Sequence, residues 1–250
     1  MLTLKKSLGQ HFLIDEQVSQ KIVNILQEKS FKRLVEIGPG GGALTKYLVS
    51  VPSIDFKCIE IDTEKVNHLI KAFPQLQGRI ITEDILETEK PFEEPFTVVG
   101  NFPYNISTQI VFKMLDWKDS VETMIGMFQK EVAQRIAAKE GSKIYGVTSV
   151  FVQAFFSVDY LFEVDENAFK PPPKVNSAVI RLTPLSTSVE MKNIRSFTVL
   201  VKTAFNQRRK TLRNAVKALF APEVLEDIIF NKRAEELSVQ QFGALTFRMN

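Results

Sequence analysis

Short apolar runs alternate with stretches of helical periodicity along the first three quarters of the chain. The run Phe96–Gly100 is too short for a helix and is typical of a strand buried on both faces. In 15–29, apolar residues such as Val18, Ile22 and Leu26 recur on one side, which predicts an amphipathic helix. Alternation of this kind indicates right-handed βαβ crossovers and a mostly parallel sheet in an α/β fold. Strands are expected at 34–37, 56–61, 79–82, 96–101, 124–128, 158–164 and 178–182, and helices at 15–29, 43–49, 63–73 (capped by Thr63), 107–117 (capped by Ser107) and 130–138.

The strand pattern ends near residue 184 and is replaced by a purely helical one. Residues 185–189 have the composition of a linker, and from Asn193 onward only helical periodicity remains. Ser238 and Gln241 form a capping box, which predicts the start of the last helix. We therefore expect a sheet domain over residues 1–184 and a small all-helical domain over residues 185–250.

Composition narrows the classes of protein that fit. The chain has 250 residues, of which 44% are apolar and 24% charged, as in ordinary globular proteins. No apolar stretch reaches the roughly 20 residues of a membrane helix, and no signal peptide is expected at the N-terminus. The single cysteine, Cys58, is expected in the core, which fits a reducing cytoplasm. Together with His11 and His68 it offers no cluster of metal ligands, so no metal is expected.

Basic residues are concentrated in one segment, although the net charge is only +3. Residues 191–222 contain no Asp or Glu. Such a one-signed surface predicts binding to a polyanion, whereas solvated helix faces usually mix both signs. The basic residues of the segment are Lys192, Arg195, Lys202, Arg208, Arg209, Lys210, Arg213 and Lys217.

Three successive strand ends carry groups suited to a nucleoside ligand. Glycines from Gly38 to Gly42 let the backbone pass close to a ligand at a helix N-terminus. Glu60, 22 residues after Gly38, can accept both hydroxyls of a ribose. Asp84 can accept from an adenine amine. Each feature alone has a plainer interpretation: a tight turn for the glycine loop, a solvated charge for Glu60 and a turn cap for Asp84. The glycine loop alone also fits a dinucleotide-binding dehydrogenase.

The fourth strand ends in Asn101-Phe102-Pro103-Tyr104, a motif suited to holding an amino-bearing base. The Asn101 side-chain oxygen and the backbone carbonyl of Phe102 or Pro103 can accept the two hydrogens of the amine, and Tyr104 can stack on the base. Pro103 restricts the local backbone. Phe169, before a proline-rich loop, is expected to stack on the opposite side of the base. The plainer alternatives are a turn for the motif and core packing for Phe169.

With these motifs the chain resembles the bacterial 16S rRNA adenine dimethyltransferases over nearly its full length. The resemblance implies a Rossmann-like class I methyltransferase domain with S-adenosylmethionine as donor. It also implies a small-subunit rRNA substrate and a monomeric enzyme without metal. Three positions depart from the family pattern: His11 for a common Asn, Phe102 for a common Leu and Glu83 for a common Gly. The strings that carry the resemblance are 6–13, 36–40, 60–62, 84, 101–106, 129–132, 143–146, 169–178 and 205–214.

The resemblance also implies roles for individual residues. Methyl transfer is assigned to Asn101, Pro103, Tyr104 and Phe169, and the helical domain is expected to bind RNA. The expected cofactor contacts are His11, Leu13, Gly38, Glu60, Asp84 and Asn101. The expected RNA contacts are Arg208, Arg209, Lys210 and Arg213, with Lys5 and Lys6 adding to them.

Three other functions remain open from the sequence. One is the related 23S rRNA adenine methyltransferase activity that confers macrolide resistance, which shares the donor and acceptor motifs. The second is a non-catalytic ribosome-assembly factor that uses the same basic surface. The third is a nucleotide-dependent oxidoreductase. The N-terminal string and the string 207–214 favour the 16S rRNA enzyme.

Overall fold

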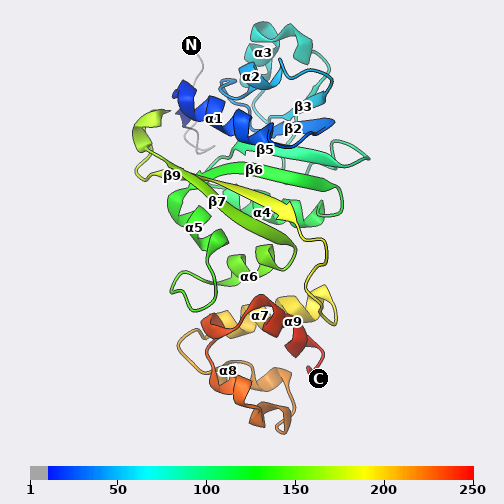
Figure 1. Cartoon of the computed structure of the whole chain (residues 1–250), viewed down its shortest axis with the longest axis vertical. Helices are drawn as coiled ribbons and strands as arrows, with labels where there is room; N and C mark the ends of the chain where they lie inside the picture. The colour runs from blue at the N-terminus through cyan, green and yellow to red at the C-terminus, as the bar shows by residue number, and fades with distance from the viewer. Residues whose placement is uncertain (1–10) are drawn as a thin grey trace. The chain divides into compact units, whose positions relative to one another are not determined.

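The computed structural model describes residues 11–250, so Lys5 and Lys6 lie outside the described residues. The chain divides into two compact units (Figure 1). Unit 1 runs to Ala133 and resumes over Val158–Pro184, and unit 2 comprises Gln134–Ser157 and Leu185–Asn250. The expected boundary after Pro184 coincides with the third and last crossing between units. The segment 134–157, which the sequence pattern assigned to the sheet domain, groups with the helical unit instead.

A seven-stranded sheet forms the centre of unit 1, with strand order β4-β3-β2-β5-β6-β9-β7. The pairs among β2 to β6 are parallel, and β9 joins β6 antiparallel. This arrangement confirms the predicted α/β fold, including both late strands. The strands are β2 (Arg33–Ile37), β3 (Asp55–Ile59), β4 (Ile80–Ile81), β5 (Phe96–Asn101), β6 (Val121–Gln129), β7 (Phe156–Val164) and β9 (Ser177–Pro184).

The strand order reverses between β2 and β5. From β2 the chain winds outward through β3 to β4, and it then returns to pair β5 with the other side of β2. In open α/β sheets, ligands bind beyond the carboxyl ends of the strands at such a switch point. The glycine loop after β2 and the Asn101 motif after β5 therefore meet at the place where the topology favours a ligand.

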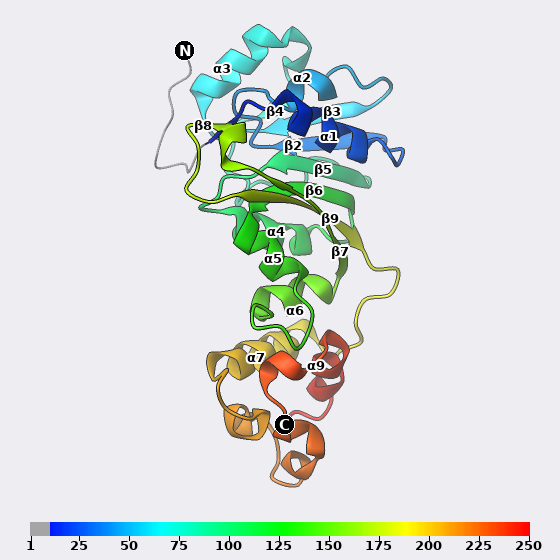
Figure 2. The same ribbon diagram turned by 60° about the vertical axis from the view of Figure 1, so that its left-hand side comes forward.

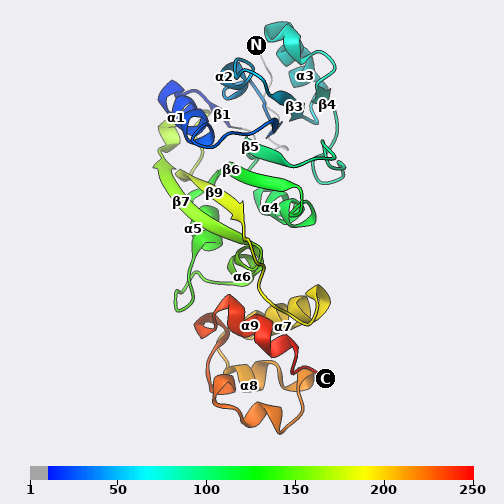
Figure 3. The same ribbon diagram turned by 45° about the vertical axis from the view of Figure 1, so that its right-hand side comes forward.

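Helices cover both faces of the sheet, with α1 and α4 on opposite sides (Figures 2 and 3). Ile22, Val23 and Leu26 of α1 belong to a core cluster that includes Val99 and Ile125 of the sheet. The helices of unit 1 are α1 (Glu16–Leu26), α2 (Thr45–Leu48), α3 (Thr63–Ala72), α4 (Ser107–Asp116) and the start of α5 (Lys130–Ala137), with short 3₁₀ turns η2 (Pro74–Leu76) and η3 (Glu166–Ala168).

Two of the predicted caps were wrong by one residue. Asp62, rather than Thr63, caps α3, because its carboxylate accepts a hydrogen bond from the Glu64 N–H at 3.1 Å. Ser107 is the first residue of α4 and does not cap it. Its hydroxyl donates to the Tyr104 carbonyl at 3.2 Å, so it ties the helix to the end of the Asn101 motif.

A second sheet of only two short strands was not predicted. β1 (Phe12–Leu13) pairs antiparallel with β8 (Phe169–Lys170). Ile14 extends the contact, because its N–H donates to the Ala168 carbonyl at 2.8 Å. Two-residue strands leave no periodicity in a sequence, so only the folded chain brings these segments together.

Unit 2 is built from helices, as the sequence predicted for residues 193–250. Segment 134–157 joins it because Phe151 packs edge-on against Phe197 at 5.7 Å between ring centroids and Val189 N–H donates to the Ala154 carbonyl at 3.1 Å. The predicted capping box of Ser238 and Gln241 is confirmed. The elements of unit 2 are α6 (Val147–Gln153), α7 (Ile194–Asn206), α8 (Leu212–Ala215), α9 (Val239–Thr246) and the 3₁₀ turns η4 (Lys217–Leu219), η5 (Val224–Glu226), η6 (Ile228–Asn231) and η7 (Ala234–Glu236).

Within residues 11–250, no helix combines the length and the apolar character that crossing a bilayer requires.

Candidate active site

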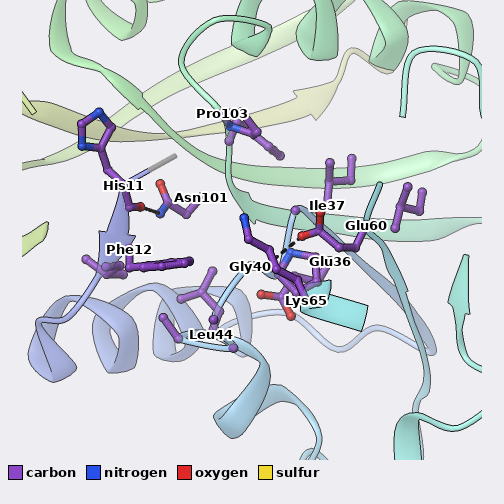
Figure 4. Close-up of a pocket in the computed structure, with 18 of the residues that line it drawn as sticks. His11, Phe12, Glu36, Ile37, Gly40, Leu44, Glu60, Lys65, Asn101 and Pro103 are labelled. Atoms are coloured by element: carbon purple, nitrogen blue, oxygen red, sulfur yellow. Dashed lines mark hydrogen bonds between the residues drawn. The ribbon is translucent and has the colours of Figure 1, made fainter. Parts of the chain in front are cut away.

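A cavity of ≈ 790 Å³ opens at the switch point of unit 1 (Figure 4). Its size lies within the range of small-molecule and cofactor sites. The loops that follow β2, β3, β4 and β5 line it together with residues 11–14. All six predicted cofactor contacts line the cavity, as do Pro103 and Tyr104. Phe169 does not.

The glycine loop brings the donor side of the cavity against the acceptor motif. Gly38 and Gly40 have φ of 66° and 56°, a left-handed conformation that costs glycine little. A Cβ on Gly38 would lie 3.6 Å from Cδ of the Pro103 ring. The loop after β2 and the motif after β5 are therefore in close contact.

Glu60 is held in place at the end of β3 by two backbone groups. Its carboxylate is 5% exposed, and it accepts from Gly40 N–H at 3.2 Å and from Asp62 N–H at 3.0 Å. A carboxylate offers about four acceptor positions, so acceptor capacity remains for the two hydroxyls of a ribose. The same hydrogen bonds join the acid to the glycine loop, which explains why the two predicted motifs lie together.

Glu36, at the end of β2, is a buried carboxyl that sequence reasoning did not single out. Thr45 donates its hydroxyl to Glu36 Oε2 at 2.7 Å. Burial, helped by the nearby Glu60 charge, raises the pKa of Glu36 from 4.5 to about 8 against the lowering effect of the Thr45 hydrogen bond. The group lines the cavity. Its sequence signal was its place two residues before the glycine loop, in a strand of apolar neighbours.

The raised pKa of Glu36 predicts a pH-dependent stability. Between about pH 4.5 and about pH 8 the folded protein retains a proton that the unfolded chain releases, so the free energy of unfolding falls as pH rises through this window. Each unit of pKa shift corresponds to about 1.4 kcal/mol. In Glu36→Gln, the neutral amide removes this titration, so the variant gains stability relative to the original protein between about pH 5 and about pH 8. Urea unfolding of both proteins across the window measures the difference, and an equal pH slope for the two would contradict the buried, protonated carboxyl.

Asp84 combines a turn cap with a position at the cavity. Its Oδ1 accepts from the Leu86 N–H at 2.9 Å, and Thr88 donates its hydroxyl to the Asp84 carbonyl at 2.7 Å. One oxygen of the Asp84 carboxylate therefore acts as a turn cap, which was the plainer interpretation from the sequence. The residue also lines the cavity, so the cap holds the carboxylate at its edge.

On the acceptor side, His11 contacts both groups that the sequence assigned to base binding. Asn101 Nδ2 donates to the His11 carbonyl at 3.4 Å (Figure 4). The His11 ring stacks on Tyr104 with 5.4 Å between centroids and 27° between planes, and its Nδ1 lies 2.9 Å from the Pro171 carbonyl oxygen. Tyr104 is held at its other end, because its hydroxyl lies 2.5 Å from Ser177 Oγ. Burial raises the pKa of Tyr104, which keeps the phenol neutral.

Phe169 lies in the core of unit 1 and is not among the residues that line the cavity. The Phe169 side chain is 2% exposed and belongs to the core cluster, and its backbone pairs with that of Leu13. In this structure Phe169 therefore anchors the N-terminal segment, and its stacking on the target base stays a prediction. The proline-rich loop after Phe169 contributes through its Pro171 carbonyl, which lies beside the His11 ring.

Lys65 and Phe12 line the cavity although the sequence gave no reason to expect it. Lys65, in the first turn of α3, is 2% exposed, and its Nζ lies 5.3 Å from the centroid of the Phe12 ring. From the sequence alone, a lysine in an amphipathic helix is expected to be exposed to solvent. Burial of its long side chain beside the glycine loop depends on the position of Phe12, which the β1–β8 pairing sets.

The predicted RNA contacts in unit 2 fall into two groups. Arg209, Lys210 and Arg213 are exposed. Arg208 is half-buried, with Nε 3.4 Å from Glu235 Oε2 and Nη2 donating to the Ser142 carbonyl at 3.4 Å. Arg208 therefore holds segments of unit 2 together, a role that the basic sequence pattern did not indicate.

Neither metal nor thiol chemistry is supported by the part of the chain that the structure describes. Residues 11–250 contain no group of three or more His, Cys, Asp or Glu side chains able to hold a metal ion. Cys58 is fully buried in β3, and burial raises the pKa of its thiol well above the ordinary value. It is a core residue, as the sequence predicted.

Three features at the switch point of such a sheet define the class I S-adenosylmethionine-dependent methyltransferases. They are a glycine loop, an acidic residue that can bind a ribose, and an amine-binding motif. The cavity would fit this donor chemically, since Glu60 retains acceptors for a ribose and Glu60 and Asp84 both line the cavity. Residues 1–247 match the family described as Ribosomal RNA adenine dimethylase, and the chain belongs to that family.

Relatives and solved structures agree with this family. A protein of Cytophaga hutchinsonii named Ribosomal RNA small subunit methyltransferase A is 49% identical over 97% of this chain and 95% of the relative. One of the same name from Flavobacterium johnsoniae is 50% identical over 97% and 94%. A dimethyladenosine transferase from Plasmodium falciparum has a TM-score of 0.80 at 26% identity, covering 93% of this chain and 94% of that one. The chain is accordingly an S-adenosylmethionine-dependent methyltransferase.

The fold is also shared with the 23S rRNA methyltransferase ErmE, with a TM-score of 0.70 at 22% identity over 94% of this chain and 99% of that one. This likeness concerns the fold alone. The higher identity and the names of the first relatives do not favour the 23S rRNA alternative or a nicotinamide-dependent oxidoreductase.

Proposed function

We propose that this enzyme transfers methyl groups to the exocyclic nitrogens of two adjacent adenines near the 3′ end of 16S rRNA, twice per base, in small-subunit particles. The observation that carries the proposal is the contact between the amine-binding motif and the donor loop, with Pro103 packed over Gly38. The names of the relatives support the small subunit as the substrate. The proposed enzyme works as a monomer in the cytoplasm during subunit assembly.

The donor pocket is assigned by the chemistry of its lining. Glu60 accepts from the ribose hydroxyls, and Asp84 accepts from the adenine amine of the cofactor. Backbone groups of Gly38 and of the segment His11–Leu13 bound the same pocket. When bound, S-adenosylmethionine supplies a methyl group activated by a sulfonium.

Asn101 and Tyr104 hold the target base in the proposed mechanism. The hydrogen bond from Asn101 Nδ2 to the His11 carbonyl leaves the Asn101 side-chain oxygen for the target amine. A backbone carbonyl of Phe102 or Pro103 takes the second amine hydrogen, so the nitrogen lone pair points at the methyl carbon. Rate enhancement then comes from placing the reactants in line and excluding water. The nitrogen becomes acidic once alkylated, so its proton passes to solvent without a strong base.

In the proposed mechanism the target adenine takes the place of the His11 ring on Tyr104. Among the described residues, the His11 ring has a stacking contact with Tyr104 and a hydrogen-bond contact with the Pro171 carbonyl to give up. A base that stacks on Tyr104 gains about 1–3 kcal/mol. The base must leave its own RNA stack to enter, as for other enzymes that modify bases.

The exposed cations of unit 2 are proposed to bind the rRNA backbone without reading its sequence. Arg213→Ala is expected to weaken RNA binding and to reduce the slope of log K against log salt by about 1, because one phosphate contact is lost. Filter binding at several salt concentrations measures the slope. Arg79→Ala in unit 1 is the matched control, since Arg79 already pairs with Asp55 at 3.5 Å. An unchanged slope in Arg213→Ala would remove this surface from the RNA interface.

Primer-extension mapping tests the proposal as a whole. Undermethylated small-subunit particles are incubated with the protein and S-adenosylmethionine, and the expected result is two adjacent stops near the 3′ end of 16S rRNA. In a parallel incubation with 23S rRNA, stops on that RNA instead would favour the resistance-type activity. Binding to the particles without any stop would favour a non-catalytic assembly factor.

A further inference from the structure

The side chain of Phe102 lies in a slot made by two glycines on neighbouring strands. Gly100 of β5 and Gly126 of β6 are partners in the parallel ladder. A Cβ on Gly126 would lie 2.2 Å from Cε2 of the Phe102 ring, and a Cβ on Gly100 would lie 2.6 Å from Cε1. Carbon atoms do not approach so closely without a shift, so the ring occupies the space that two side chains would otherwise fill.

The ring is confined on its remaining sides as well. Phe128 packs against it edge-on, with 5.2 Å between centroids and 60° between planes. Phe102 is 1% exposed. The Phe102 N–H donates to the Met127 carbonyl at 3.3 Å, which extends the β5–β6 pairing by one residue. Both the backbone and the ring of Phe102 are therefore anchored to β6.

This anchor lies between the two parts of the acceptor motif. Asn101 immediately precedes Phe102, and Pro103 follows it and packs over Gly38 of the donor loop. The carbonyl of Ile37, one residue before Gly38, would lie 2.6 Å from a Cβ on Gly100, so the slot also abuts the end of β2. A shift of the Phe102 ring would move Asn101 and Pro103 relative to the donor loop.

We propose that the slot formed by Gly100 and Gly126 makes Phe102 a positioning residue, which sets the placement of Asn101 relative to the methyl donor. The inference rests on the proposed role of Asn101. Because Phe102 acts through its neighbours, its disturbance lowers kcat and leaves the affinity for S-adenosylmethionine nearly unchanged. A misplacement of about 1 Å can cost about 100-fold in rate.

The test inserts a methyl group into the slot and then relieves the overlap at one of two positions. Gly126→Ala overlaps with Phe102 and also with Phe128, whose Cε2 would lie 2.7 Å from the new Cβ. It is expected to lower kcat by about 100-fold with the dissociation constant for S-adenosylmethionine within about two-fold. Adding Phe102→Leu, which removes the closest ring atoms, should restore kcat by at least about ten-fold. Adding Phe128→Leu instead relieves only the other contact and should not restore it.

Methyl incorporation into undermethylated small-subunit particles measures kcat, and calorimetry measures donor binding. Two results would overturn the positioning role. One is equal rescue of kcat by the two leucine substitutions, and the other is a loss of donor affinity that parallels the loss of kcat. If Gly126→Ala does not fold, Phe102→Leu alone gives the answer. It should lower kcat by about ten-fold with donor binding retained, and an unchanged kcat would overturn the inference.

Failure of the proposed function would be seen separately. In that case the unsubstituted protein would bind S-adenosylmethionine but leave the small-subunit particles unmethylated. The positioning inference concerns only the differences among variants of an active protein.

Discussion

Asn101→Ala is expected to lower kcat by about 100-fold or more, while the variant still binds rRNA and S-adenosylmethionine. The substitution removes the side-chain oxygen that accepts from the target amine, so the base loses the contact that aims its nitrogen at the methyl carbon. It also removes the hydrogen bond from Nδ2 to the His11 carbonyl, which holds the N-terminal segment at the cavity. Single-turnover methylation of small-subunit particles, with filter binding of the RNA in parallel, separates the chemical step from binding.

Asn167→Ala is the matched control for this substitution. Asn167 is an exposed asparagine of the same unit, and its side chain donates to Asp165 at 2.7 Å. Its loss should leave methylation unchanged. Methylation by Asn101→Ala at the original rate would refute the assignment of Asn101 to the reaction, and loss of RNA binding together with methylation would indicate a structural role.

Glu60→Gln is expected to weaken S-adenosylmethionine binding by about 10- to 100-fold, since hydrogen bonds to a charged group contribute about 1.5–3 kcal/mol. The carboxylate accepts from two backbone N–H groups and retains acceptors for the ribose, whereas an amide presents only one oxygen. The NH₂ group of the glutamine would face either Gly40 N–H or Asp62 N–H, both of which are donors. Calorimetric titration with S-adenosylmethionine measures the dissociation constant directly.

The control for Glu60 is Glu93→Gln, which neutralises an exposed carboxylate whose nearest cation, Lys90, lies 3.9 Å away. Its donor affinity should equal that of the original protein. Thermal unfolding of Glu60→Gln without ligand shows whether the strand end keeps its structure. If a stably folded Glu60→Gln bound the donor with unchanged affinity, the ribose would have to be held by other residues.

Local sequence patterns were sufficient where the relevant contacts are close in the chain or follow from strand order. Residues 96–101 form a strand, as predicted, because a short apolar run is typical of a strand in a sheet covered on both faces. The glycine loop, Glu60 and Asn101 could be predicted to meet, because the carboxyl ends of parallel strands share one edge. The last helix could be predicted from the capping box of Ser238 and Gln241.

Patterns did not reveal contacts between residues far apart in the chain. The pairing of Phe169 with Leu13, which places Phe169 in the core, was not predicted. The contacts of Arg208 with Glu235 and Ser142 were not predicted either. Neither partner is marked by periodicity or by spacing, since long-range contacts are chosen only when the chain packs.

The sequence by itself determined the α/β class, the helical C-terminal portion, the donor loop and the acceptor motif, because hydrophobic periodicity and short motifs are properties of neighbouring residues. Only the tertiary structure decided how the acceptor motif is held. The Gly100–Gly126 slot requires β5 and β6 to pair in one register, and a shift of one residue would put side chains where the Phe102 ring lies. Steric exclusion between strands, which no single segment encodes, therefore sets the position of Asn101.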